Sequence, residues 1–139
     1  MFKKLFLPFT VAVFLFLVFS FFYANSSPVL KKESENIEIY YEYGSFGKSE
    51  KYDALTFNKS KTKGESCKLS GVSYENILKD FSATHVFTEE TAFGVSYYAF
   101  SPFIPYRAVI GGKVVNLHYF VSFNSNRTVL GTPIIFGSY

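Results

Sequence analysis

The sequence predicts an α+β domain: a curved antiparallel sheet with one or two short helices packed on one face, preceded by an N-terminal hydrophobic helix. Three observations carry this prediction. An uncharged apolar run fills the N-terminus, several later segments alternate apolar and polar residues as half-buried strands do, and one short segment has an apolar stripe at helical spacing. Strands that outnumber helices and follow one another favour antiparallel pairing with the helices gathered on one side.

The N-terminal run extends from Leu5 to Tyr23 without a charged residue. As a helix it would be roughly 28 Å long, close to the thickness of the hydrocarbon core of a bilayer. Residues 1–26 are therefore interpreted as a cleaved signal peptide or as an uncleaved membrane anchor spanning residues 5–24. A buried globular helix is the third alternative.

Two further features bear on this segment. Small residues before the Ser26–Ser27 bond make Ser26 and Ser27 the candidate cleavage site. Lys3 and Lys4 precede the apolar run and favour a cytoplasmic N-terminus. We therefore expect an extracytoplasmic domain, secreted or attached to the outer face of the cytoplasmic membrane.

The rest of the chain divides into a polar linker at residues 27–36 and a single α+β domain at residues 37–139. Without Lys3 and Lys4, 12 basic residues face 11 acidic ones, so the domain is nearly neutral. Nucleic-acid binders carry a strong basic surplus, because neutralising phosphates drives their affinity. The composition therefore argues against nucleic acid as a partner.

The first elements of the domain are expected as follows. Clean alternation predicts a strand over residues 37–43, and glycines predict a turn over 44–49. A returning strand is expected over 52–57, and a lysine-rich loop over 59–70. Ser73 can cap a helix through Phe81, whose apolar residues recur on a single stripe: Tyr74, Ile77, Leu78 and Phe81.

The remaining elements are all expected as strands. Residues 84–88 and 92–100 follow the helix, and the prolines of 101–105 break the ladder. The Gly111-Gly112 pair predicts a hairpin between 107–110 and 113–123. A last strand is expected over 128–136, as an edge strand or a bulged one, because Pro133 cannot donate a ladder hydrogen bond.

No combination of residues matches a known catalytic, cofactor or metal signature. Cys67 is the only cysteine, which excludes an intrachain disulfide and zinc sites built on paired cysteines. The only histidines, His85 and His118, lie at no recognised metal-ligand spacing. The adjacent Glu89 and Glu90 would point to opposite faces of a strand, which does not suit a paired acid and base. We therefore expect a chain that is not an enzyme and has no cofactor.

The one basic cluster lies in the expected loop and consists of Lys59, Lys61, Lys63 and Lys68. A solvated loop accounts for such a cluster. The functional alternative is contact with anionic lipid headgroups or an anionic wall polymer, at roughly 1 kcal/mol for each lysine near a charged surface.

The C-terminal half resembles the YwmB-like family of exported Firmicutes proteins, called TATA-box-binding-protein-like after their fold. The resemblance rests on two elements, Gly-Gly-Lys-Val-Val-Asn-Leu at 111–117 and Gly-Thr-Pro-Ile-Ile at 131–135, and it covers about residues 73–139. It implies a signal or anchor segment and a curved sheet with helices on one face. It implies no catalytic residues. The chain has Ser122 where family members often have arginine, and it is too short for the second lobe that they usually have.

These observations predict a non-catalytic extracytoplasmic domain that binds a protein or an envelope component, in the wall or the membrane. Two alternatives remain open. One is an enzyme that modifies envelope polymers without a recognisable motif. The other is nucleic-acid binding, which the near-neutral charge and the expected export disfavour.

Overall fold

The computed structural model describes residues 2–41 and 49–136, and within the first helix it describes the side chains of residues 7–20. The helices are α1 (Phe2–Ser26) and α2 (Tyr74–Asp80), with two 3₁₀ helices, η1 (Val29–Lys32) and η2 (Lys59–Lys61). The strands are β1 (Ile37–Tyr40), β2 (Ser49–Lys51), β3 (Gly64–Leu69), β4 (Thr84–Glu90), β5 (Gly94–Phe100), β6 (Ala108–Ile110), β7 (Lys113–Val115), β8 (Leu117–Ser122) and β9 (Thr128–Thr132).

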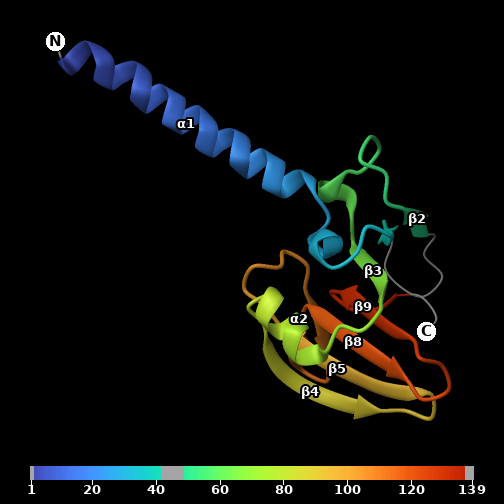
Figure 1. The fold of residues 1–139 in the computed structure, drawn as a ribbon. Helices are drawn as coiled ribbons and strands as arrows, with labels where there is room; N and C mark the ends of the chain where they lie inside the picture. Colours follow the sequence, from blue (N-terminus) through green and yellow to red (C-terminus); the bar gives the residue numbers. More distant parts are fainter. Residues whose placement is uncertain (1, 42–48, 137–139) are drawn as a thin grey trace.

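Seven strands form one sheet in the order β2-β1-β3-β9-β8-β5-β4, and each pair of neighbours is antiparallel. Strands β6 and β7 form a separate two-stranded ribbon. Figure 1 shows α2 lying across one face of the large sheet and α1 extending away from it. The expected α+β class with an antiparallel sheet and an N-terminal helix is confirmed.

The N-terminal helix α1 leaves its apolar side chains uncovered by the domain. Phe9, Phe16 and Phe19 are 68%, 71% and 75% exposed. Among the residues that the structure describes, no helix is long and apolar enough to cross a membrane.

The main core lies between the sheet and the layer formed by α2 and η1. It includes Ile37 and Ile39 of β1, Leu117 of β8 and Leu130 of β9, each at most 1% exposed. The expected stripe of α2 packs onto this core, and Ser73 caps the helix through a hydrogen bond from Asn76 N–H to its hydroxyl. The predicted helix and cap are confirmed.

The opposite face of the sheet is also partly covered. Tyr98, His118 and Phe120 are buried there. The ribbon reaches this face through two cations, since Arg107 lies over the ring of Phe100 and Lys113 over that of Phe87. Both Gly111 and Gly112 have positive φ at the tip of the ribbon, which confirms the predicted hairpin.

Several strand predictions are wrong. Residues 52–57 form a turn instead of a strand, because the Asp53 side chain accepts a hydrogen bond from Leu55 N–H and its carbonyl accepts one from Phe57 N–H. The expected loop over 59–70 contains η2 and the interior strand β3. The expected turn over 44–49 lies largely outside the described residues.

Two strands at the C-terminal end also differ from the prediction. The expected strand 113–123 divides at Asn116, whose side chain bonds the backbone of Ser101, so that β7 and β8 belong to different sheets. The last strand is neither an edge strand nor bulged, because β9 pairs with β3 on one side and β8 on the other and ends before Pro133.

Residues 27–36 are folded onto the domain, whereas the sequence suggested a linker. Leu30 of η1 is fully buried in the core. The buried Glu65 carboxylate on β3 accepts hydrogen bonds from Val29 N–H and Leu30 N–H at 2.9 and 3.0 Å. These contacts fix the position at which α1 leaves the domain.

Candidate functional site

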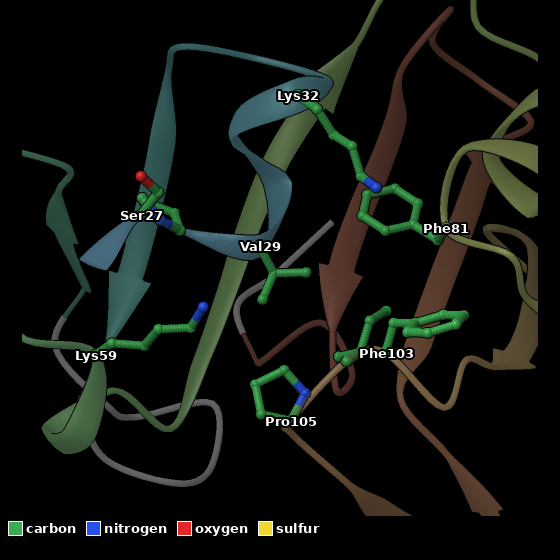
Figure 2. A pocket seen from close by; sticks show the side chains of 9 residues that line it. Ser27, Val29, Lys32, Lys59, Phe81, Phe103 and Pro105 are labelled. Atoms are coloured by element: carbon green, nitrogen blue, oxygen red, sulfur yellow. The ribbon is translucent and has the colours of Figure 1, made fainter. Parts of the chain in front are cut away.

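The candidate site is a pocket at the junction between α1 and the domain, hereafter the junction pocket. Its lining comes from the segment that follows α1, from η2 and from the 101–105 loop, and it has a volume of about 200 Å³. Figure 2 shows Val29 and Pro105 reaching into it from these segments, with Lys59 on one side and Lys32 over Phe81 on the other. These segments are far apart in the sequence and are brought together by the docking of η1.

The buried Glu65 holds η1, which contributes to the lining of the pocket. Besides the amides of η1, its carboxylate accepts a hydrogen bond from the Tyr106 hydroxyl at 2.9 Å. Burial raises the pKa of Glu65, and the three donors and the nearby Lys59 oppose that rise by stabilising the carboxylate. Glu65 therefore links β3, η1 and the chain that follows the 101–105 loop.

Lys59 contributes one ammonium group to the pocket. Burial lowers its pKa, and the negative charge of Glu65 counters part of this effect. Among the residues that the structure describes, Lys59 forms no ion pair. It therefore presents to the cavity a cation that the charge of Glu65 stabilises without forming an ion pair.

Lys32 contributes the second ammonium group from the other side. It donates a hydrogen bond to the Asp80 carbonyl at 2.7 Å and lies 4.3 Å from the centre of the Phe81 ring. An ammonium group has three N–H donors, so this arrangement leaves others for a ligand. Sequence reasoning missed Lys32, because it lay in a segment interpreted as a linker.

The four lysines of the predicted basic cluster differ in their surroundings. Lys59 lines the junction pocket, whereas Lys61 is exposed at the end of η2 and Lys63 is half-buried beyond it. Lys68 alternates along β3 with the buried Cys67, so it is exposed on the opposite face of the sheet.

One of the two candidate cleavage residues, Ser27, lies at the pocket. Ser26 is the last residue of α1, and Ser27 lines the cavity. A chain cut between them would therefore begin at the pocket.

His118 and Ser96 form the only buried serine–histidine contact among the described residues, with 2.8 Å between Ser96 Oγ and His118 Nε2. The Ile135 N–H donates to His118 Nδ1, so the neutral ring carries its proton on Nε2 and donates it to the serine. Burial lowers the pKa of His118 to about 4. The ring is therefore a fixed hydrogen-bonding group and not a base for Ser96.

The other residues considered for chemistry are dispersed. His85 is exposed on β4, where Nδ1 lies 2.7 Å from the Tyr74 hydroxyl, and Glu89 and Glu90 are exposed at the end of the same strand. Cys67 is buried in the core, and burial raises the pKa of its thiol to about 12. Across the described ranges, no group of three histidine, cysteine or carboxylate side chains is placed to hold a metal ion.

Comparison with known proteins gives no relative: no family model, no curated protein and no solved structure matches the chain.

Proposed function

We propose that this chain is an exported bacterial protein whose domain binds an envelope component outside the cytoplasm and has no catalytic role. The observation that carries the proposal is α1. Its apolar side chains remain exposed beyond the folded domain, and Phe19 alone is 75% exposed. Exposed apolar surface costs about 25 cal/mol for each Å², so such a helix requires an apolar environment or removal.

An export signal meets that requirement in either of two ways. The helix stays in the membrane as an anchor, or it is removed at the Ser26–Ser27 bond after it has directed export. Lys3 and Lys4 before the apolar run support both forms, because positive residues remain on the cytoplasmic side. Both forms place the domain in the extracytoplasmic space.

A binding role is supported by the fact that the buried polar residues already have hydrogen-bond partners within the domain. His118 and Glu65 are occupied by hydrogen bonds that hold the backbone, and the Cys67 thiol is buried. The junction pocket combines exposed apolar surface with two ammonium groups. This combination suits recognition of an anionic envelope component, with no contact to nucleic acid.

We also place the chain with the YwmB-like exported proteins as part of this proposal. The support comes from the order of the motifs. Gly111-Gly112 forms the hairpin tip, and residues 131–135 begin in the last two residues of the central strand β9 and continue beyond it. An experimental structure superposed on a member of that family tests the kinship. A different strand order in the sheet would refute it.

Export is tested with alkaline phosphatase, which is active only outside the cytoplasm, fused after Tyr139. We expect activity from the wild-type fusion and its loss in Leu15→Arg, which places a charge in the middle of α1. The matched control is Val109→Arg, because Val109 is a similarly exposed apolar residue of the domain, 68% exposed against 59% for Leu15. An active Leu15→Arg fusion would rule out α1 as an export signal.

The fate of the helix is read from the intact mass of the native protein. A mass that begins at Ser27 indicates cleavage, and a full-length mass in the membrane fraction indicates an anchor. A full-length chain in the soluble cytoplasmic fraction would overturn the proposed function.

A further inference from the structure

The junction pocket lies where the chain passes from the apolar helix to the folded domain. Ser27 directly follows α1 and lines the cavity together with Val29 of η1. Figure 1 shows α1 meeting the domain at this end of the molecule. If α1 enters the membrane, this pocket faces the lipid headgroups.

The surface around the pocket is amphiphilic. Phe103, at its edge, is 79% exposed, and Pro105 of the same loop is exposed beside it. An exposed apolar ring of this kind is buried favourably when it inserts at the boundary between headgroups and acyl chains. Lys32 and Lys59 place two positive charges within the same cavity.

We propose that the junction pocket binds the headgroup of an anionic phospholipid, with its phosphate against Lys59 and Lys32 and the first part of its acyl chains against Phe103 and Pro105. This inference rests on the proposed function, because it requires the domain to lie at a membrane. The volume of about 200 Å³ suits a headgroup and excludes the acyl chains from the interior.

A second physical account of the two lysines must be separated from this one. The carbonyl end of α1 lies beside the pocket, and the partial negative charge of a helix C-terminus stabilises nearby cations. Lys32 also interacts with the charge of the Glu33 carboxyl group and donates a hydrogen bond to the Asp80 carbonyl. If the two lysines only stabilise the helix end and these neighbouring groups, the pocket should bind anionic and zwitterionic lipids equally well. Lipid selectivity therefore separates the two accounts.

The experiment is native mass spectrometry of the full-length chain in a non-ionic detergent, with phosphatidylglycerol and phosphatidylcholine of identical acyl chains as probes. We expect the wild-type chain to retain phosphatidylglycerol in preference to phosphatidylcholine. The Lys32→Gln/Lys59→Gln variant should bind phosphatidylglycerol about 25-fold more weakly, at roughly 5-fold for each lysine. The matched control, Lys51→Gln/Lys68→Gln, removes the same charge from exposed strand residues and should retain the wild-type preference.

Three results would overturn the inference. They are equal retention of both lipids by the wild-type chain, unchanged binding in the Lys32→Gln/Lys59→Gln variant, and an equal loss in the control. A further arm adds inorganic phosphate. If phosphate alone binds as tightly as phosphatidylglycerol, the pocket is an anion site and the lipid assignment is wrong.

Folding of each variant is checked by circular dichroism, because Lys32 also bonds the Asp80 carbonyl. If the double variant unfolds, the single variant Lys59→Gln replaces it, with an expected loss of roughly 5-fold. Unchanged binding in that variant refutes the role of Lys59. The phosphatase fusion measures export in cells and the mass spectra measure lipid selectivity in vitro, so failure of export and failure of the lipid site give different results.

Discussion

Substitution of Glu65 by leucine should detach the segment that follows α1. Leucine has a similar size but accepts no hydrogen bonds, so Val29 N–H, Leu30 N–H and the Tyr106 hydroxyl lose their acceptor. A buried donor left without a partner costs about 1–3 kcal/mol. Removing the carboxylate also removes the desolvation cost that raises its pKa, which offsets part of the loss. We expect a net destabilisation of about 3 kcal/mol.

Two variants separate the hydrogen bonds from the charge. Glu65→Gln keeps one acceptor oxygen and should lower the free energy of unfolding by about 1–2 kcal/mol. The new NH₂ group of glutamine is a donor, so one of the two backbone N–H groups then faces another donor in place of an acceptor. Glu89→Gln, on an exposed part of β4, is the matched control and should stay within about 0.5 kcal/mol of the wild-type protein.

The assay is urea unfolding of the full-length chain in a mild detergent, followed by circular dichroism, together with amide hydrogen exchange at Val29 and Leu30. Exchange at these amides should accelerate strongly in Glu65→Leu. If the variant unfolds at the wild-type urea concentration and both amides remain protected, the assignment of Glu65 as the anchor of η1 is wrong.

Three further predictions concern titratable groups. Because the pKa of His118 is about 4 in the fold against about 6.5 when free, stability should fall by roughly 3 kcal/mol as the pH drops from about 6.5 to 4, and urea midpoints of His118→Gln should lose this dependence. Burial, and then the neighbouring Asp80, raise the pKa of Glu33 to about 7, so stability should fall as the pH rises from about 4.5 to 7, and Glu33→Gln should flatten that part of the curve. Cys67, with its pKa raised to about 12, should resist iodoacetamide at pH 8 until denaturant is added, as followed by intact mass.

The first two effects have opposite signs in overlapping pH ranges, so the wild-type curve alone does not separate them. His85→Gln, which removes an exposed histidine, is the control for the first effect, and Glu38→Gln on β1 is the control for the second. An acid transition that persists in His118→Gln would contradict the burial of a neutral ring. Rapid native alkylation would contradict the placement of Cys67 in the core.

The elements that the sequence predicted correctly are those whose local signal agrees with the fold. In α2, the apolar stripe, the Ser73 cap and the acidic residue Glu75 in the first turn all favour the same helix. The ribbon has two glycines in the left-handed conformation that its turn requires. In both cases the residues that decide the structure are neighbours in the sequence.

The elements that were missed depend on contacts with distant residues. Strand β3 has the sequence Gly-Glu-Ser-Cys-Lys-Leu, which shows no apolar alternation. One of its inward-facing residues is the charged Glu65, which can be buried because η1 and Tyr106 donate hydrogen bonds to it. The order of the sheet places β3 and β9 at its centre although both carry loop-like residues. No local pattern encodes such pairings, so the sequence predicted a loop in place of β3 and an edge or bulged strand in place of β9.

The candidate site was predicted only in part for the same reason. The sequence predicted that Lys59 contacts an anionic surface. Its position beside Lys32 and Phe103 depends on the docking of η1, which the sequence did not predict. That docking in turn depends on Glu65, which has no visible role in the sequence. The feature that identifies Glu65 as an anchor is its burial within a polar strand. That burial can be recognised only after the strand itself has been located.

The buried polar residues of this domain share one task, which is to hold irregular segments against the sheet. Glu65 bonds the backbone of η1, the Asn116 side chain bonds Ser101 N–H at 2.7 Å, and His118 accepts a hydrogen bond from Ile135 N–H. Because each group is already bonded to backbone, none of them is available to transfer a proton to a ligand without releasing the segment that it holds. The Lys59 ammonium group at the junction pocket holds no such backbone segment. For this reason we place ligand binding at the junction pocket and not at the buried His118.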